Sequence, residues 1–385
     1  MDLDLTPEQE LLRDTVRGMC AKHASLDVVR RMEDDPVGFP EKFWLQLAEL
    51  GLLGLTLPEA WGGSGMSMLD AVVVYQELGR ALAPSPHFAS SVISGGVLAR
   101  AGTDQQRKAW LPAIAAGDAI ITPAWLEPGG GFGPEGVQLR ASNDGDGWRL
   151  AGSKRHVPFA RGADRLLVLA RTGEEIVLLL VDPGAPGVAL DQQHTIASDT
   201  QYRVDFDEVR VGADALVGTT DGGWPAWDAV MHDGIVLLAA QAVGGARHAL
   251  DMTVQYAKDR RQFDKPLGAF QAIAHYLADA VAAVDGAETL VWEAAWARDA
   301  GRSHARLAPM AKLFACKTFR DVTAMAQQVF GGVGFTVEYD IQLYFRRAKQ
   351  LQLSWWDDRY LEELIATDVL DHGSPPPGPP GPAGD

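Results

Sequence analysis

Apolar residues recur every three to four positions in two long parts of the chain, and this spacing predicts helices. In the first part, Thr6 can cap a helix, Pro7 suits its first position, and Gln9 can complete a capping box. A stretch around Pro58 carries five glycines in fifteen residues, which predicts a loop between helical segments. We therefore predict an N-terminal helical domain over residues 1–118.

The middle of the chain alternates short runs of Val, Leu and Arg with glycine clusters, as in GWRLAGSKRHV, DRLLVLART and YRVDFDEVRV. This texture predicts a β domain over residues 119–222. Helical spacing then returns in long segments such as APMAKLFACKTFRDVTAMAQQVF, so residues 223–371 are predicted to form a helical bundle. Residues 372–385 end in SPPPGPPGPAGD and are predicted to be a disordered tail, because this composition buries little apolar surface.

Composition and charge exclude several classes of protein. A chain of 385 residues with 47% hydrophobic content can bury two or three domain cores. A net charge of −17 argues against nucleic acid or an anionic membrane as the main partner. Cys20 and Cys316 lie far apart, which indicates neither a disulfide scaffold nor a metal site. The N-terminus has no signal-peptide pattern, so we expect a cytoplasmic protein.

The segment QVFGGVGF, residues 328–335, places three glycines between two predicted helices. Glycine adopts positive φ and lets the backbone approach a ligand closely. The same residues also suit a turn that ends a helix. The segment alone leaves both interpretations open.

A longer segment, YAKDRRQFDKPLGAFQAIAHYLAD, resembles the signature of the acyl-CoA dehydrogenase family of flavoproteins. The matching positions are Tyr256, Ala257, Arg260, Phe263, Pro266, Phe270 and Gln271, whereas Asp264 replaces a glycine. QVFGGVGF and two N-terminal segments, LGLLGLTLPEAWGGSG and WLPAIAAGDAIITPAWLEPGGG, match as well, so the resemblance covers nearly the whole chain. It implies an α+β fold with an N-terminal helical domain, a middle antiparallel β domain and a C-terminal four-helix bundle.

The resemblance also implies FAD as cofactor, an acyl-CoA substrate, an electron-transferring flavoprotein as acceptor, and a dimer or tetramer. It assigns Arg260 and Gln271, with Phe263 in the same motif, to the ADP half of FAD. A guanidinium offers a planar fork of donors that suits a pyrophosphate. The residues implied to reach the adenosine of a neighbouring subunit's FAD are Gln328, Gly331 and Gly332.

The usual catalytic base of the family is missing at the positions that resemble its motifs. Alignment through RRAK puts Trp355 where most members carry a glutamate, and tryptophan cannot take a proton there. A second position used by some members aligns with Gly234, so Asp233 beside it is our candidate for a substitute base. Asp357 and Asp358 are a second option. Each of these aspartates also suits a plain role at a helix start.

The expected flavin-ring pocket departs from the family too. His156 and Pro158 stand where the resemblance implies tryptophan and threonine, and Pro158 has no hydroxyl or N–H to offer a flavin. His156 remains able to contact the ring. Leu126 and Phe132 replace a threonine and a serine, so only the backbone amides of Trp125 and Leu126 are expected to serve the flavin.

Three functions are compatible with these departures. The first is an FAD-dependent acyl-CoA dehydrogenase of fatty acid or steroid side-chain metabolism, active alone or as one subunit of a heteromer. Heteromeric members that act on bulky acyl-CoAs are similar in lacking the usual glutamate. The second is a non-catalytic partner that completes a sister chain's FAD site, and the third is a non-redox acyl-CoA lyase or dehydratase on the same fold.

Overall fold

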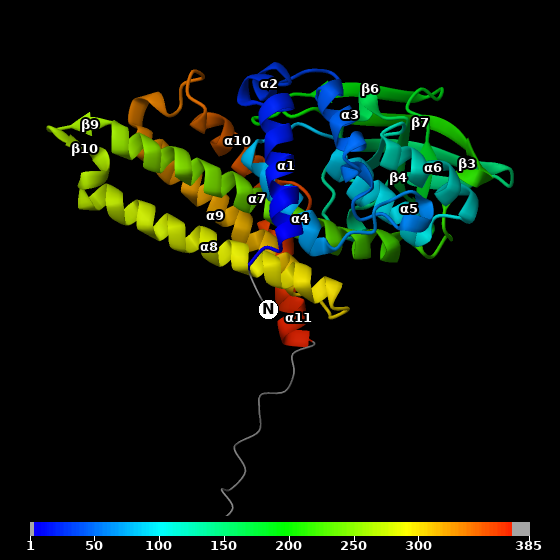
Figure 1. Cartoon of the computed structure of the whole chain (residues 1–385). Coiled ribbons are helices and arrows are strands. Elements are labelled where there is room, and N and C mark those ends of the chain that lie inside the picture. Colours follow the sequence, from blue (N-terminus) through cyan, green and yellow to red (C-terminus); the bar gives the residue numbers. More distant parts are fainter. Residues whose placement is uncertain (1–3, 372–385) are drawn as a thin grey trace, which may run out of the picture.

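The computed structural model describes residues 4–371 and arranges them in three successive parts (Figure 1). The N-terminal part is helical as predicted, with α1 (Pro7–His23), α2 (Leu26–Arg31), α3 (Glu41–Glu49), α4 (Met68–Arg80), α5 (Gly95–Ala101) and α6 (Asp104–Ala116). The capping box of α1 is confirmed, because Thr6 and Gln9 each accept the other's backbone N–H. The predicted disordered tail lies outside the described residues.

The middle part is an eight-stranded sheet with the spatial order β6-β7-β3-β2-β4-β5-β8, in which β1 also pairs with β4. Its strands are β1 (Ile121–Ala124), β2 (Arg140–Asn143), β3 (Gly147–Pro158), β4 (Arg165–Thr172), β5 (Glu175–Val181), β6 (Val188–Gln193), β7 (Gln201–Gly212) and β8 (Leu216–Val217). Most neighbours are antiparallel as predicted, but β4 runs parallel to β1 and β2. The sheet is therefore mixed. Parallel pairing needs a long connection, and the β2–β3 hairpin lies between β1 and β4 in the chain.

Strands β4 and β5 separate two hydrophobic cores. Successive side chains of a strand point to opposite faces of the sheet. Leu167 and Leu169 of β4 lie in a core shared with the helices, whereas Leu166 and Val168 lie in the core of the β domain. Burial on both faces explains why these two strands are almost continuously apolar instead of alternating.

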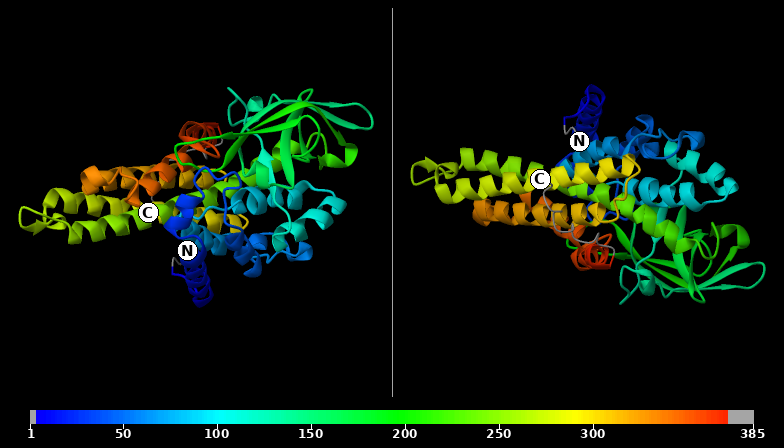
Figure 2. Two further views of the ribbon diagram at one scale, coloured as in Figure 1. Left: turned by 90° about the horizontal axis from the view of Figure 1, so that it is seen from above. Right: turned by 90° about the horizontal axis from the view of Figure 1, so that it is seen from below.

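The C-terminal part is the predicted helical bundle, in which α7 to α10 pack against one another. Its helices are α7 (Gly223–Asp259), α8 (Gln271–Asp299), α9 (Leu307–Phe330), α10 (Ile341–Leu353) and α11 (Asp358–Asp371). The α7–α8 hairpin, which turns through β9 (Arg261–Gln262) and β10 (Lys265–Pro266), extends away from the sheet (Figure 2). By length and composition α7 resembles a membrane span, but 72% of its most apolar window is buried, as in a core helix.

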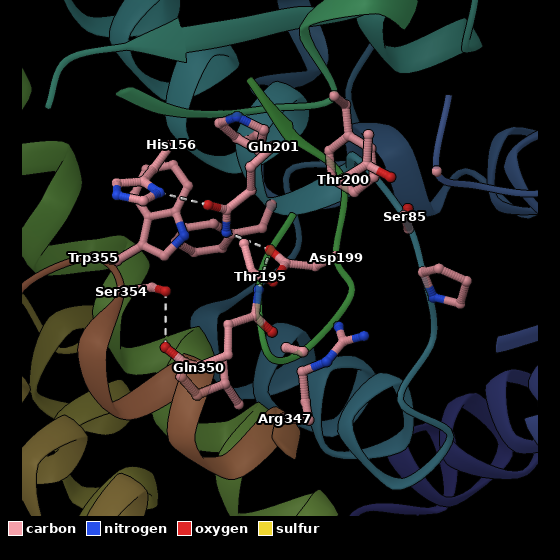
Figure 3. A pocket seen from close by; sticks show the side chains of 18 of the residues that line it. Ser85, His156, Thr195, Asp199, Thr200, Gln201, Arg347, Gln350, Ser354 and Trp355 are labelled. Atoms are coloured by element: carbon pink, nitrogen blue, oxygen red, sulfur yellow. Dashed lines mark hydrogen bonds between the residues drawn. The ribbon is translucent and has the colours of Figure 1, made fainter. Parts of the chain in front are cut away.

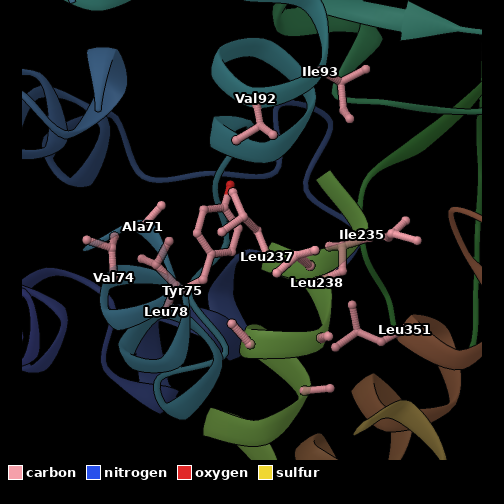
Figure 4. Close-up of a cluster of buried hydrophobic side chains, with 14 of the residues drawn as sticks. Ala71, Val74, Tyr75, Leu78, Val92, Ile93, Ile235, Leu237, Leu238 and Leu351 are labelled. Atoms are coloured by element: carbon pink, nitrogen blue, oxygen red, sulfur yellow. The ribbon is translucent and has the colours of Figure 1, made fainter. Parts of the chain in front are cut away.

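Helices from two parts of the chain together build one hydrophobic core (Figure 4). Tyr75 and Leu78 of α4 pack with Leu238 of α7 and Leu351 of α10 in one cluster of buried side chains. Because α4 and α7 are far apart in sequence, this cluster joins the N-terminal helices to the bundle. The two parts therefore share a single core.

Helices α4 and α7 approach until their backbones touch. A Cβ atom on Gly79 would lie 1.9 Å from the carbonyl oxygen of Gln241, and a Cβ on Gly244 would lie 1.9 Å from that of Gln76. No side chain fits at either position without moving a helix. The two glycines thus set the distance between α4 and α7.

We predict that Gly244→Ala lowers the free energy of unfolding by more than about 2 kcal/mol, because the methyl group forces the two helices apart. Gly18→Ala is the matched control: Gly18 is exposed on α1 with nothing within 4 Å of the added Cβ. It should change stability little or raise it by up to about 1 kcal/mol. Urea unfolding of both variants measures the difference, and equal stabilities would contradict the close contact.

Candidate functional site

A cavity of about 350 Å³ lies where the three parts of the chain meet. Its wall comes from α4, the π-helical segment η3 (Phe88–Ser94), residues 195–200 between β6 and β7 together with Gln201 at the start of β7, α7, and the end of α10. Figure 3 shows these side chains converging from several elements. Four site residues predicted from the sequence line this cavity, namely Trp125, Leu126, His156 and Trp355.

Trp355 lies against other aromatic rings in the cavity wall. Its ring is stacked on Trp125 with centroids 6.0 Å apart, and Phe88 meets it edge-on at 4.9 Å. An indole packed in this way gives the cavity an apolar surface. The position that resembles the family's base therefore carries a wall residue with no proton-accepting group.

The turn that carries Trp355 has unusual backbone geometry. Trp355 and Trp356 have φ angles of 55° and 74°, a region that bulky residues rarely adopt and that costs free energy. Lys312 of α9 is fully buried beneath the turn and donates to the carbonyl of Leu351 at 3.1 Å and to that of Trp356 at 2.8 Å. Burial lowers the pKa of this lysine. These two hydrogen bonds hold the turn in its strained form.

Tyr75 and His87 form a buried pair in the cavity wall. His87 Nε2 lies 2.8 Å from the carbonyl oxygen of Leu52, which can only accept, so Nε2 carries the proton. Nδ1 of the neutral ring then accepts the hydroxyl hydrogen of Tyr75 at 2.8 Å. Burial lowers the pKa of His87 to about 4 and raises the pKa of Tyr75 well above its usual value, so both groups are neutral near pH 7.

A second hydrogen-bonded chain crosses the cavity beside Trp355. His156 Nδ1 donates to Gln201 Oε1 at 2.8 Å, and the amide nitrogen of Gln201 donates to Asp199. Asp199 also accepts the amide nitrogen of Gln350 from α10 (Figure 3). The Asp199 carboxylate is therefore engaged by side chains from the sheet and from the bundle.

The segment with Trp125 and Leu126 is fixed by a buried ion pair that the sequence analysis did not single out. Lys154 of β3 is fully buried and donates to the carbonyl of Trp125 at 3.1 Å and to Glu127 at 2.6 Å. Burial lowers the pKa of Lys154 to about 8, against the effect of Glu127. In the sequence, the feature that could have indicated this buried ion pair is a lysine at an inward-facing position of a predicted strand.

Asp233 is absent from the described wall of the cavity, which weakens its candidacy as a base. Its carboxylate lies 2.9 Å from His304 Nε2 and 3.5 Å from the guanidinium of Arg298. Burial alone would raise the pKa of Asp233, but these two neighbours overcome it, and the pKa lies below its usual value. A carboxylate stabilised in its charged form is a weak proton acceptor.

Asp357 and Asp358, the second pair of candidate bases, both act at the start of helix α11. The Asp357 carboxylate accepts the backbone N–H of Tyr360 at 3.0 Å, as an N-terminal cap of α11 does. Asp358 is the first residue of α11, and its carboxylate accepts the amide nitrogen of Gln352. We therefore do not retain either aspartate as a base.

The residues expected to bind the ADP half of FAD lie at the far end of the bundle. All six are exposed there, namely Arg260, Phe263, Gln271, Gln328, Gly331 and Gly332. Tyr256 brings the two motifs together, because its ring stacks on Phe330 at 4.1 Å and its hydroxyl donates to the Phe330 carbonyl. Gly331 has φ 65° and ψ −145°, a conformation that requires glycine.

This arrangement fits FAD shared between subunits. Within residues 4–371, the Arg260 guanidinium has no ion-pair partner, and a fork of free donors suits a pyrophosphate. The same end of the bundle exposes large apolar side chains, including Phe263 at 86% and Phe335 at 75%. The features together are those of the flavoprotein class that the sequence resembles.

Comparison with known proteins identifies the family. Family models described as the acyl-CoA dehydrogenase N-terminal, middle and C-terminal domains match residues 6–118, 123–209 and 221–355. The probable acyl-CoA dehydrogenase YngJ of Bacillus subtilis is 31% identical over 383 residues, which span 96% of this chain and 100% of that protein. The chain belongs to the acyl-CoA dehydrogenase family. This confirms the predicted family, fold, oxidoreductase class and FAD as cofactor.

Two similar solved structures carry paired names. A chain from the ChsE4-ChsE5 complex of Mycobacterium tuberculosis is 28% identical with a TM-score of 0.87, covering 96% of this chain and 99% of that chain. A chain from a variant of the steroid ACAD Tcur3481-Tcur3483 is 32% identical with a TM-score of 0.85, covering 95% and 98%. Both likenesses extend over all three parts of the fold.

The pKa of His87 predicts how stability depends on pH. Histidine in an unfolded chain titrates near pH 6.5, whereas folded His87 titrates near 4, so between these values only the unfolded state gains the proton. Stability therefore falls as pH falls through this window, by about 1.4 kcal/mol per pH unit for this group. His248, whose pKa burial also lowers to about 4, adds to the same slope.

His87→Gln should remove about 1.4 kcal/mol per pH unit from that slope. Urea unfolding at pH 6, 5.5 and 5, which lie inside the window between the two pKa values, measures the slope for each variant. His275→Gln on α8 is the control, because His275 is exposed, and it should leave the slope unchanged. Equal slopes for wild type and His87→Gln would show that His87 is not held neutral by burial.

Proposed function

We propose that this chain is one subunit of an FAD-dependent acyl-CoA dehydrogenase that it forms with a related chain. The observation that carries the proposal is the separation of two groups of residues. Arg260, Gln271 and Gln328 are exposed at the far end of the bundle, whereas the cavity with Trp355 lies where the three parts of the chain meet. Donors placed there serve an FAD bound by a neighbouring subunit. The two similar structures with paired names support a heteromer.

The reaction needs a hydride acceptor and a group that removes the α-proton of the thioester. FAD, when bound, supplies the first. For the second, the described cavity wall offers two carboxylates, and both are engaged: Glu33 pairs with Arg346, and Asp199 accepts from Gln201 and Gln350. We therefore assign the proton-accepting carboxylate to the sister chain. Electrons then leave to an electron-transferring flavoprotein.

The acyl group of the substrate belongs to the fatty acid or steroid side-chain class. A volume of about 350 Å³ lies within the usual range of small-molecule sites. A role as a non-catalytic partner is the second candidate, and the packing of Trp355 on Trp125 favours it. In both cases this chain completes the FAD site of its neighbour, and we place the assembly in the cytoplasm.

Purification of the tagged chain from its own host tests the proposal. We expect a related chain of the same family to co-purify in stoichiometric amount. Arg260→Gln should weaken FAD binding by the assembly about 10- to 100-fold, since charge-assisted hydrogen bonds are worth about 1.5–3 kcal/mol. Flavin absorbance per subunit, followed during dialysis, measures the loss.

Arg359→Gln is the control, because Arg359 is an 87% exposed arginine on α11 whose ion-pair partner is Glu363 on the same helix. It should leave FAD content unchanged. A homo-oligomer with one FAD per chain, retained in Arg260→Gln, would contradict the proposal.

A further inference from the structure

Two consecutive arginines of α10 differ sharply in their partners. Arg346 donates to Gln342 at 2.8 Å and to the carbonyl of Ile196 at 3.2 Å, and it pairs with Glu33. Arg347 lines the cavity and makes no hydrogen bond or ion pair to any residue in the range 4–371. Arg346 thus has a structural role, whereas the fork of donors on Arg347 is unused.

The protein environment does not compensate the charge of Arg347. Burial lowers the pKa of its guanidinium, with Asp199 and Glu33 acting in the opposite direction. Yet Asp199 is bound to Gln201 and Gln350, and Glu33 is bound to Arg346. The Arg347 side chain is half-buried. A partly desolvated cation without a bonded anion is costly, and this cost is recovered when a ligand supplies the anion.

A second unused polar group lies one helical turn further along. Gln350 Oε1 is buried and has no hydrogen-bond partner, although the nitrogen of the same amide binds Asp199. Residues three positions apart lie on one face of a helix. Figure 3 shows Arg347 and Gln350 on the same side of the cavity, facing the segment with Thr195 and Asp199. The cavity therefore offers a free cationic fork beside a free acceptor.

The surroundings favour one carboxylate over a phosphate. Arg347 is the single lysine or arginine among the described residues of the cavity wall, which also contains Glu33 and Asp199. A pyrophosphate there would meet two carboxylates with only one cation to balance it. The same cavity wall also carries apolar side chains, including Val29, Met32, Leu78 and Leu238. An aliphatic chain ending in a carboxylate matches this combination, because a guanidinium binds a carboxylate through two parallel hydrogen bonds.

We propose that Arg347 is a specificity-determining residue that binds a carboxylate at the distal end of the substrate's acyl chain, so that the cavity takes ω-carboxyacyl-CoA thioesters. This inference rests on the proposed function, because it assumes that an acyl-CoA enters the cavity. The thioester end lies toward the aromatic wall of Trp125 and Trp355.

Isothermal titration of the full-length protein, with whatever subunits and flavin it carries, tests the inference. The probes are matched pairs of thioesters with four to ten acyl carbons, each pair differing only by a terminal carboxylate, such as octanoyl-CoA and suberyl-CoA. We expect the carboxylate to tighten binding at least about 10-fold for one chain length. Arg347→Gln should then weaken that ω-carboxyacyl-CoA about 10- to 100-fold and change the plain acyl-CoA less than about 3-fold.

Two further variants separate specific recognition from damage to the fold. Arg347→Lys keeps the charge but loses the planar fork, so its affinity for the ω-carboxyacyl-CoA should fall between those of wild type and Arg347→Gln. Arg359→Gln is the exposed control and should bind as wild type does. Because Arg347 has no bonded partner, Arg347→Gln should not lower the melting temperature.

Arg347 could bind either the carboxylate of the acyl chain or a phosphate of CoA. The corresponding pantetheine thioesters, which lack the phosphates of CoA, distinguish these two anions. The proposal requires Arg347→Gln to weaken suberyl-pantetheine as much as suberyl-CoA. If the variant instead weakens octanoyl-CoA and suberyl-CoA equally and spares both pantetheine thioesters, Arg347 binds a CoA phosphate and the proposal is wrong. If the plain acyl-CoA thioesters bind and the terminal carboxylate does not tighten binding, this inference is wrong, whereas the proposed function is unaffected. If no thioester binds at all, the proposed function fails with it.

Discussion

The contact between the backbones of α4 and α7 is the constraint on which the rest of the structure depends. Gly79 and Gly244 let the two helices approach until each glycine meets a carbonyl oxygen of the other helix. The cavity begins beside this contact, with Tyr75 and Leu78 on α4 and Leu238 and Gln241 on α7. The N-terminal helices and the bundle are joined at this contact. The distance between α4 and α7 therefore sets the width of the cavity between them.

On this scaffold the end of the bundle and the cavity carry two separate groups of side chains. The end of the bundle holds Arg260 and the Gly331 turn together through the stack of Tyr256 on Phe330. At the cavity, Lys312 holds a strained turn that presents an indole where the sequence resemblance places a glutamate. A buried lysine and two tryptophans with positive φ are costly, so the surrounding structure must hold this turn in place. The structure thus separates an exposed group of hydrogen-bond donors at the end of the bundle from a cavity with an aromatic wall.

Features that depend on neighbouring residues were predictable from the sequence. The capping box at Thr6 and Gln9, the loop near Pro58 and the continuous apolar strands follow from local pattern. The motif around Arg260 identified the family because it spans few residues with strict spacing. Parallel pairing of β4 was not predictable, since it depends on which strands become neighbours across a long connection.

Features that depend on pairs distant in sequence were missed. His87 is fixed by Leu52, and Lys312 acts on Trp356; neither relation leaves a local signal. Asp233 was a reasonable candidate beside an aligned position, but the sequence could not show that His304 and Arg298 would engage it. The sequence could not distinguish Arg347 from the adjacent Arg346, since only the structure shows that Arg346 pairs with the Glu33 carboxylate.

The visible absorption spectrum of the chain purified alone, before and after addition of acyl-CoA thioesters, distinguishes a subunit that needs a related chain from a self-sufficient dehydrogenase. The proposed heteromer predicts a colourless protein that gains flavin absorbance only when the related chain is present, because the exposed donors of one chain would serve an FAD in the other. A yellow protein with one FAD per chain, bleached by an acyl-CoA without any partner, would contradict it. Such a result would mean that this chain carries a complete dehydrogenase site of its own.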